Sequence, residues 1–521
     1  MKTKILIFLA LATILFSCKS QQKFNAKIKA KHAPEELIKD LEIVRNSLEE
    51  NHPGVYLYTS KKELDFKFDS LKKTLNDSLV PLQFYRELAP IVAAVKCGHT
   101  KLFFPGIQLN KFQKDSIKKE GLKPLSQLFY FVDSNRLFIK AVSDKSLVAP
   151  IKGSEILAID GKPASEIIKK TKSLYSSDGY NTTFYDQVLD KSFDAYYYLG
   201  YGKSDSSKLT LKRAESTFNY IIKTIKPAKG EKKLLTPEEI GKKKITDKQA
   251  RKLKLKNRYK GSDDFGNPLL DLKFDSVLNS TAIMTVKSFS FNKSNFRKFF
   301  RESFEELKEK NIQHLILDVR NNGGGNLMDC NRLFRYLYNQ PHQYTGRAYM
   351  NNAYLHSIKY QEISPFLKVA KIISYPISVV ANIFLTHKDS IGIYGYIPTT
   401  HQKKPLKKGF ENDLIVLTNG YSFSATSLLC ANLQEVGRGK FVGEETGGGY
   451  NQCTAGSIPY IKLPNTGLKL RLPLKVIQIT DQRKLYGRGV FPEYEVKESF
   501  EDVLHKRDII LNKAKELVKA Q

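Results

Sequence analysis

Apolar residues recur every three or four positions through the first part of the chain, and this spacing predicts amphipathic helices. Two stretches follow the pattern: Leu37, Leu41, Val44 and Leu48, then Leu64, Phe68, Leu71 and Leu75. The run Asn51-His52-Pro53-Gly54 separates them, because proline and glycine both disfavour a continuous helix. Residues 33–104 are therefore predicted to form an N-terminal helical domain.

Between residues 105 and 225 this spacing gives way to short apolar runs that are typical of strands. The runs 128–132 and 137–142 flank the turn Asp133-Ser134-Asn135 and predict a β-hairpin. A later strand ends at Asp160-Gly161 and leads into a short helix, an order that resembles the second half of a PDZ domain. PDZ domains bind chain ends as an added strand. A small β domain without a ligand accounts for the pattern equally well.

From residue 263 onwards the pattern predicts alternating strands and helices. Ala282–Val286 and Leu315–Val319 are apolar enough for buried strands, and between them one face of a helix is apolar. The residues of that face are Phe296, Phe299, Phe300, Phe304 and Leu307. Such alternation predicts an α/β core over residues 263–521, with functional sites at the ends of its strands.

An insertion at residues 341–412 interrupts this core and contains the apolar stretch Phe366–Leu385. Lys368, Lys371 and Pro376 argue against a membrane-spanning helix there. A lid over the site, a surface helix that touches lipid, and a helix packed on its own domain are the alternatives. The last of these is the simplest interpretation.

The composition indicates a folded protein of several domains, since 41% of its 521 residues are hydrophobic, with 31 Phe and 27 Tyr. The net charge is +32, and part of it lies in a basic insertion or linker at residues 226–262. Residues 226–260 hold 14 Lys or Arg against 4 Asp or Glu. No aromatic residue precedes Tyr259 in that run, so a nucleic-acid groove is disfavoured and a solvated insertion, or one touching acidic lipid or polymer, is favoured.

The N-terminus has the pattern of an export signal. Lys2 and Lys4 precede the apolar stretch Ile5–Phe16, and Cys18 follows it as in a bacterial lipoprotein signal over residues 1–18. We therefore expect Cys18 to be lipidated, residues 19–32 to be a tether, and the chain to be anchored in the cell envelope on its periplasmic or surface side. An ordinary signal peptide and an uncleaved anchor are the alternatives.

Three local patterns carry candidate chemistry. Ser424 follows an apolar strand and an Asn-Gly turn and begins a helix, a position that suits a nucleophilic hydroxyl. His99, in Cys97-Gly98-His99-Thr100, is the candidate base. Gly323, Gly324 and Gly325 follow a second strand and expose backbone N–H groups of the kind that an oxyanion hole needs. A helix-capping serine, a structural histidine and a flexible turn are the plain alternatives.

Together these segments resemble the tail-specific, or C-terminal processing, serine peptidases. Asp318–Gly325 is similar to the oxyanion loop of that family, and Ser422–Thr426 to its nucleophile motif. Val442–Thr446 and Gly487–Glu493 are similar to its later motifs. The resemblance implies a crotonase- or ClpP-like α/β core, with Ser424 as nucleophile and the backbone of Gly323, Gly324 and Ala425 as oxyanion donors. It implies protein or peptide substrates and neither a metal nor an organic cofactor, while the remaining cysteines lack the spacing of a zinc site.

The departures from the family pattern bear on the base. Gly449 stands where many members have a catalytic lysine, so the resemblance favours the tricorn-like branch, which pairs serine with histidine, here His99. Gly98 and Tyr486 stand where that branch has a supporting serine and glutamate. The third member is therefore open, and its candidates are Asp481, Glu445 and Glu493. We predict an exported serine endopeptidase that does not bind nucleic acid; a peptide- or lipid-binding protein on the same fold, without catalysis, is the alternative.

Overall fold

The computed structural model describes residues 21–108, 121–225, 259–262, 267–290, 294–352, 360–479 and 487–520. The predicted lipoprotein signal with Cys18, most of the basic insertion 226–262 and the candidate Asp481 lie outside the described residues. The domain limits drawn from the sequence stay predictions, and the elements below are given as the structure has them.

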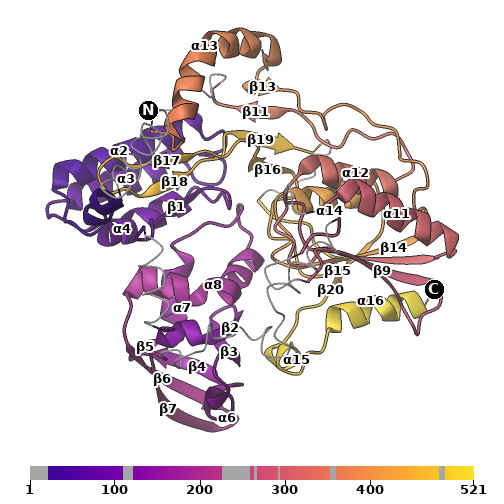
Figure 1. Ribbon diagram of the computed structural model, residues 1–521, viewed down its shortest axis with the longest axis horizontal. Helices are drawn as coiled ribbons and strands as arrows, with labels where there is room; N and C mark the ends of the chain where they lie inside the picture. Colours follow the sequence, from indigo (N-terminus) through magenta and orange to yellow (C-terminus); the bar gives the residue numbers. More distant parts are fainter. Residues whose placement is uncertain are drawn as a thin grey trace, which may run out of the picture.

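A six-stranded sheet forms the centre of the C-terminal half, on the right of Figure 1. Its order is β20 (Tyr494–Glu495), β15 (Lys440–Gly443), β14 (Asp413–Thr418), β10 (His314–Asp318), β9 (Thr281–Val286) and β8 (Leu270–Phe274). All neighbouring pairs are parallel except β8 with β9. Strands covered on both faces read as continuous apolar runs, which is why the sequence revealed them.

Helices cover both faces of this sheet. Residues of α11 (Phe296–Glu309), α12 (Leu327–Leu337) and α14 (Ala425–Glu435) share one buried cluster with Leu315 and Leu317 of β10. On the other face, α16 (Ile509–Lys519) packs on Ile316. Successive side chains of β10 therefore point to opposite faces of the sheet and pack against helices on both sides. The predicted α/β core is confirmed.

The N-terminal half, on the left and below in Figure 1, combines helices with a second sheet. The helices are α2 (Pro34–Asn51), α3 (Lys61–Thr74), α4 (Pro81–Ala93), the short α6 (Val148–Ile151), α7 (Ala164–Lys172) and α8 (Thr183–Tyr201). The sheet consists of β2 (Leu128–Asp133), β3 (Arg136–Val142), β4 (Glu155–Ile159), β6 (Ser206–Arg213) and β7 (Ser216–Lys223), with β5 (Lys162–Pro163) on β4. One buried apolar cluster runs through these helices and this sheet, so the two predicted N-terminal domains share a core.

A small three-stranded sheet joins the two halves. β1 (Lys101–Phe103) pairs antiparallel with β18 (Lys469–Arg471), and β18 pairs with β17 (Tyr460–Lys462). Buried leucines on both sides of β18, such as Leu468 and Leu472, belong to the apolar cluster of the N-terminal half. Since His99 lies just before β1, this pairing brings the candidate base to the C-terminal half.

The insertion contributes a long helix and three strands to a third region, whose five-stranded sheet also contains two strands from outside residues 341–412. The sheet contains β12 (Thr386–Lys388), β13 (Ile393–Gly395), β11 (Ala348–Met350), β19 (Lys475–Gln478) and β16 (Gln452–Ala455). The helix α13 (Pro365–Leu385) stands out at the top of Figure 1, and most of its described apolar side chains are exposed. The expectation that this helix packs on its own domain is therefore wrong. Among the described residues, none of the helices has the length and apolarity that a bilayer crossing requires.

Arg320 links α16 to the central sheet through two ion pairs, and these ion pairs give a test of the fold. The guanidinium donates to the carboxylates of Asp318, at the end of β10, and of Asp508, which caps α16. Arg320→Ala leaves both carboxylates without this partner and should lower the free energy of unfolding by about 2–3 kcal/mol, as measured by urea denaturation. Arg507→Ala, at an exposed arginine paired with Asp502, should cost less than about 1 kcal/mol. Equal losses would contradict this role of Arg320.

Candidate active site

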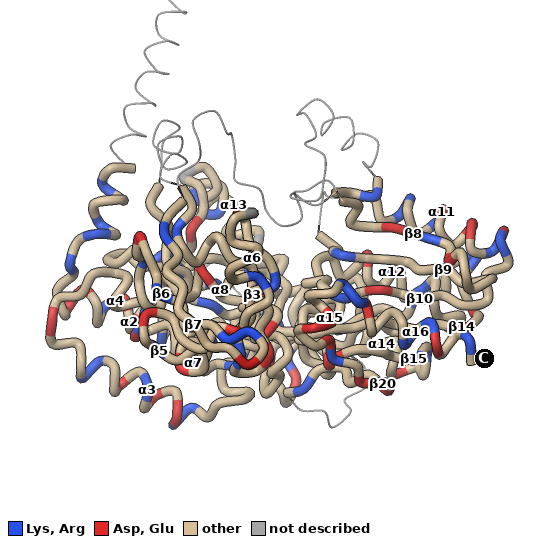
Figure 2. Tube along the Cα trace, turned by 90° about the horizontal axis from the view of Figure 1, so that it is seen from below, with Lys and Arg blue, Asp and Glu red and all other residues tan. Residues whose placement is uncertain are grey.

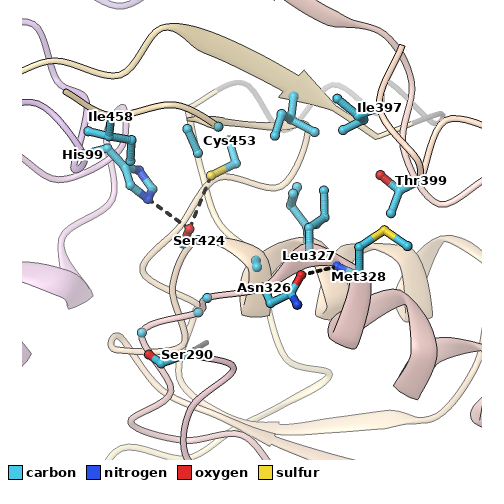
Figure 3. Close-up of a pocket in the computed structure, with 18 of the residues that line it drawn as sticks. His99, Ser290, Asn326, Leu327, Met328, Ile397, Thr399, Ser424, Cys453 and Ile458 are labelled. Carbon is cyan, nitrogen blue, oxygen red and sulfur yellow. Dashed lines mark hydrogen bonds between the residues drawn. The ribbon is translucent and has the colours of Figure 1, made fainter. Parts of the chain in front are cut away.

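Ser424 occupies a strained turn between β14 and α14. Its φ of 59° and ψ of −126° are unfavourable for a residue with a side chain, and such strain often accompanies a function. The serine stands at the N-cap of α14, yet its hydroxyl makes no capping hydrogen bond. The hydroxyl lies instead 2.9 Å from Nε2 of His99 and 3.7 Å from Sγ of Cys453 (Figure 3). The helix-cap interpretation of Ser424 is thus not supported by its contacts.

The neighbouring polar side chains hold this turn in place. Ser422 donates its hydroxyl hydrogen to the carbonyl of Val319, 2.9 Å away, and so braces the nucleophile turn against the loop that follows β10. Asn419 accepts the amide of Asn321 at 2.9 Å and that of Tyr421 at 3.1 Å. These contacts fix the two strand ends relative to each other, and they show that Ser422 is a structural brace.

His99 is buried against the same turn. Its ring is 4% exposed and stacks on the ring of Phe423, with centroids 4.8 Å apart and an interplanar angle of 29°. A Cβ on Gly98 would come within 2.6 Å of the Phe423 ring, so only glycine fits before the histidine. Phe423 therefore fills the space that a side chain at position 98 would need.

The surroundings keep the imidazole neutral. Burial lowers the pKa of His99 to about 3, and the positive charge of Arg471 and the nearby His52 contribute in the same direction. A neutral ring with its lone pair on Nε2 can accept the Ser424 proton, which places the ring hydrogen on Nδ1. That nitrogen is buried and has no hydrogen-bond partner among the described residues.

The predicted oxyanion donors surround Ser424. A Cβ on Gly324 would lie 2.8 Å from Cβ of Ser424 and 2.9 Å from the amide nitrogen of Ala425, so the glycine loop passes directly over the nucleophile. Ala425 is the first residue of α14, and an amide at that position lacks an acceptor within the helix. The amide of Gly324, however, donates to Oδ1 of Asn322 at 3.0 Å. Gly323 lies in the same loop and lines the cavity beside Ser424.

The candidates for a third member lie elsewhere or have other partners. Glu445 accepts from Arg488 and, at 2.7 Å, from the amide of Gly489. Glu493 accepts from the amide of Phe441 at 2.6 Å. Neither carboxylate is hydrogen-bonded to His99 in the described part of the chain, and Asp481 lies outside that part.

Asp178 is the carboxylate that the structure brings to His99, and sequence reasoning missed it. It lies between α7 and α8, in a polar stretch that carries no recognisable motif. Its Oδ1 accepts the amide of Gly98 at 2.7 Å, and burial raises its pKa to about 6. Its Oδ2 is buried without a partner among the described residues. A buried polar atom left unpaired costs about 1–3 kcal/mol, so such an atom needs an explanation.

The same neighbourhood contains a trio of potential metal ligands. One ring nitrogen of His99, the sulfur of Cys97 and one carboxylate oxygen of Asp178 lie within 4.8 Å of one another. Burial raises the pKa of the Cys97 thiol to about 12, so the thiol is protonated at neutral pH and is a weak ligand in that form. An ion held there would take a nitrogen of the candidate base, and the expectation that no metal takes part stays a prediction.

A cavity of about 470 Å³ opens beside the serine. His99, Ser424 and the glycine loop line one end of it, and Arg471 also reaches it. The remaining wall is largely apolar (Figure 3) and includes Leu327, Met328, Ile397, Leu428, Ile458 and Ile477. A cavity of this size and lining suits an apolar side chain next to a reacting carbonyl.

Comparison with known proteins agrees with this fold. Residues 280–496 match the family model for peptidase family S41. Mature CPAF complexed with lactacystin has a similar fold, with 17% sequence identity, a TM-score of 0.62 and coverage of 93% of this chain and 98% of that chain. A second structure of mature CPAF gives 15% identity, a TM-score of 0.59 and coverage of 93% and 97%.

A third similar structure is the photosystem II D1 C-terminal processing protease, with 14% identity, a TM-score of 0.39 and coverage of 90% of this chain and 96% of that one. Among curated proteins, none matches this chain by sequence. The two CPAF structures establish the fold, and the family match covers every strand of the central sheet except β8. Residues 280–496 thus match peptidase family S41, and the chain is a serine-type peptidase.

Proposed function

We propose that the protein is an endopeptidase in which Ser424 is the nucleophile and His99 its general base. The observation that supports this is the 2.9 Å contact between Ser424 Oγ and His99 Nε2, made by residues 325 positions apart in the chain. Nucleophilic catalysis requires a neutral base within hydrogen-bond distance of the attacking hydroxyl. The His99 imidazole is neutral, and the Ser424 hydroxyl makes no helix-capping hydrogen bond that would compete with it.

The reaction follows from these positions. Oγ of Ser424 attacks the carbonyl carbon of the substrate while its proton passes to Nε2 of His99. The imidazolium then gives that proton to the leaving amine nitrogen, the C–N bond breaks, and an acyl-enzyme ester forms. Water attacks the ester, transfers a proton to Nε2 and releases the acid, and Oγ recovers its proton.

The developing oxyanion needs preorganised donors. The amide of Ala425 at the start of α14 is one, favoured also by the positive end of the helix dipole. The second comes from the glycine loop, where Gly324 would exchange Asn322 Oδ1 for the oxyanion and Gly323 lies next to it. The resulting anion would lie between β10 and β14, where the two strand ends meet.

The apolar cavity supports a preference for substrates with an apolar side chain beside the cleaved bond. Leu327, Met328 and Ile397 line the cavity beside the nucleophile, and its volume of about 470 Å³ can hold a leucine or phenylalanine side chain. We also propose that the chain acts outside the cytoplasm, held by a lipid on Cys18, because its first residues have the pattern of a lipoprotein signal.

Replacement of either partner tests the mechanism. Ser424→Ala and His99→Ala should each lower kcat on an unfolded protein substrate by about 10⁴-fold or more, and the double variant should lose little further activity because the two residues act as a unit. Peptide release by the purified variants gives the rates. Ser303→Ala, at a buried serine of α11 away from the cavity, should retain full activity. Turnover that survives Ser424→Ala would exclude this nucleophile, whereas a wild type that binds a peptide or lipid without any turnover would favour the binding alternative.

The depressed pKa of His99 predicts how stability depends on pH. Above pH 6.5 the ring is neutral in both the folded and the unfolded chain, and its contribution to stability is complete. As the pH falls from 6.5 toward about 3, the unfolded chain binds a proton that the folded chain excludes, so this contribution is lost. The difference in unfolding free energy between the wild type and His99→Gln should therefore move in favour of the variant by about 1.4 kcal/mol per pH unit. Urea denaturation at pH 6 and pH 5 measures it, and a constant difference would contradict the assignment.

A further inference from the structure

Two buried polar atoms in the site lack a partner, and they are complementary. With the Ser424 hydroxyl donating to Nε2, the His99 ring carries its hydrogen on Nδ1, which is a buried donor without an acceptor among the described residues. Oδ2 of Asp178 is a buried acceptor without a hydrogen bond of normal geometry in the same part of the chain, although the Gly449 amide lies near enough to the carboxyl to lower its pKa. The two side chains belong to the cluster whose ligand atoms lie within 4.8 Å of one another.

The backbone holds Asp178 beside His99. The Gly98 amide donates to Oδ1 of Asp178 at 2.7 Å, and the Gly179 amide donates to the carbonyl of Lys96 at 2.8 Å, so the two segments are joined at both ends. A Cβ on Gly179 would come within 2.4 Å of Cα of Gly487, which limits movement of the loop on its other side. The Asp178 carboxylate is thus bound to the backbone of Gly98, the residue that precedes the base His99 in the chain.

We propose that Asp178 is the positioning residue of the site: its carboxylate accepts the Nδ1 hydrogen of His99 and stabilises the imidazolium that forms during proton transfer. This inference rests on the proposed function. A hydrogen bond of this kind needs a donor–acceptor distance of about 2.6–3.2 Å, and such bonds are often long in a free enzyme and shorten when substrate binds. The carboxylate also fixes the tautomer that leaves Nε2 free for Ser424.

The charges around the pair explain why a carboxylate is needed. Burial opposes a positive charge on His99, and Arg471 opposes it further. The other titratable groups in contact are uncharged near neutral pH: the Cys97 and Cys453 thiols, whose pKa values burial raises, and His52, whose pKa burial lowers to about 4. Asp178 is therefore the anion that can stabilise the imidazolium among the described residues that face it.

Asp178→Asn tests this proposal in the full chain. The variant should lower kcat by about 10²-fold or more with little change in KM, because an amide cannot stabilise the imidazolium. The wild type should lose kcat/KM as the pH falls through about 6, where Asp178 takes up a proton, and the variant should lack this acid limb. Nitrogen-15 NMR of the wild type should show a downfield Nδ1 proton on His99 that is absent from the variant. Asp40→Asn, at a buried carboxylate that accepts the Thr466 amide, is the matched control and should retain the acid limb and the downfield proton.

The outcomes separate the two proposals. Activity in Ser424→Ala would remove the proposed function itself. Loss of activity in Ser424→Ala together with unchanged kcat and an unchanged acid limb in Asp178→Asn would overturn only the role of Asp178. If Asp178→Asn does not fold, the wild-type spectrum decides, since a His99 ring protonated on Nε2 instead of Nδ1 would overturn the assignment.

A separate observation concerns α13, which presents an unusually apolar surface to solvent. Phe366, Ile372, Ile373, Ile377 and Phe384 are each between 72% and 80% exposed. A continuous row of exposed apolar side chains usually marks an interaction site. The exposed residues lie all along the helix, so the occupant of this surface must cover its whole length.

The base of α13 stands beside the N-terminal segment. The chain just before the helix adds to the edge of β17, where the amide of Glu362 donates to the carbonyl of Tyr460 at 2.7 Å. The helical residues 21–27 pack on the same hairpin, with Phe24 under the ammonium group of Lys462 at 4.5 Å. The N-terminus of the described chain and α13 therefore leave the molecule at the same edge, as Figure 1 also shows.

Lysines gather at this edge. Burial lowers the pKa of Lys462, and the charges of three lysines near it lower that pKa as well: Lys469, Lys27 and Lys368. Glu362, which pairs with Lys469 at 2.8 Å, is the acidic residue that acts on Lys462 there. Lysine and arginine are otherwise spread along the whole described chain (Figure 2). An apolar helix with a basic cluster at its base has the composition of an element that lies in an anionic lipid interface.

We infer that α13 lies in the surface of an anionic membrane, parallel to it, beside the point where the N-terminus meets that membrane. The lysine cluster favours anionic lipid over a second copy of this chain, because two such clusters would repel each other across a symmetric contact. Pro376 and the polar Ser374 and Asn382 also suit a helix at the interface, where backbone and polar groups reach water.

The absence of tryptophan from the sequence allows a direct experiment on the full chain. Phe384→Trp places a single reporter on α13, and Phe66→Trp places one on α3, at a phenylalanine of similar exposure. Figures 1 and 2 both show α3 away from α13. In vesicles of phosphatidylethanolamine and phosphatidylglycerol that contain brominated lipid, the Phe384→Trp variant should show blue-shifted, quenched emission, and the Phe66→Trp variant should not.

Charge substitutions make the experiment quantitative. Ile372→Asp with Ile377→Asp, added to Phe384→Trp, should abolish at least half of the quenching while peptidase activity in detergent is unchanged. Equal emission with and without brominated lipid would overturn the membrane assignment. A blue shift that depends on protein concentration and persists without vesicles would overturn it as well, in favour of a second copy of the chain.

Discussion

The pairing of β1 with β18 is the contact on which the rest of the site depends. Leu102 lies opposite Leu470, and leucines that flank β18 enter the apolar cluster of the N-terminal half. Burial of these side chains stabilises a junction between segments that are far apart in the chain. His99 precedes β1, so the register of this small sheet determines where the imidazole meets Ser424. A change in that register would move every side chain of β1 to the opposite face and separate the base from the nucleophile.

Exclusion of water from the site has two opposing consequences for catalysis by His99. Burial keeps His99 neutral and so makes it a base over a wide pH range, but it also disfavours the imidazolium on which proton transfer depends. A buried carboxylate can resolve this conflict, which is why the unpaired oxygen of Asp178 beside an unpaired ring nitrogen has a functional meaning. The positive φ of Ser424 is a second local cost, and the brace of Ser422 on Val319 helps to maintain it. The surrounding sheet and helices are stable enough to offset the burial of these polar groups and the backbone strain at Ser424.

Much of the architecture was predictable from the sequence, because buried parallel strands and one-faced helices leave periodic patterns. β9, β10, α11 and the turn before α14 fall within one or two residues of the expected positions. Ser424 and His99 were proposed from motifs, and the structure brings them together. Asp178 was not found, because a carboxylate that approaches through loop packing has no local pattern, and Glu445 and Glu493 were proposed from motif position although both serve to hold other segments. For α13 the sequence left a lid, a lipid-touching surface helix and a packed helix as alternatives, since an apolar helix looks the same in sequence whether protein or lipid covers it.

The most direct test of the central claim, that Ser424 and His99 form one catalytic pair, is to map the site of covalent inactivation. The full chain would be treated with a fluorophosphonate, digested and analysed by mass spectrometry. We expect a single adduct on Ser424 that forms at least about 10²-fold more slowly in His99→Ala, because the hydroxyl then lacks its base. An adduct on another serine, or an equal rate of modification with and without the imidazole, would contradict the pairing.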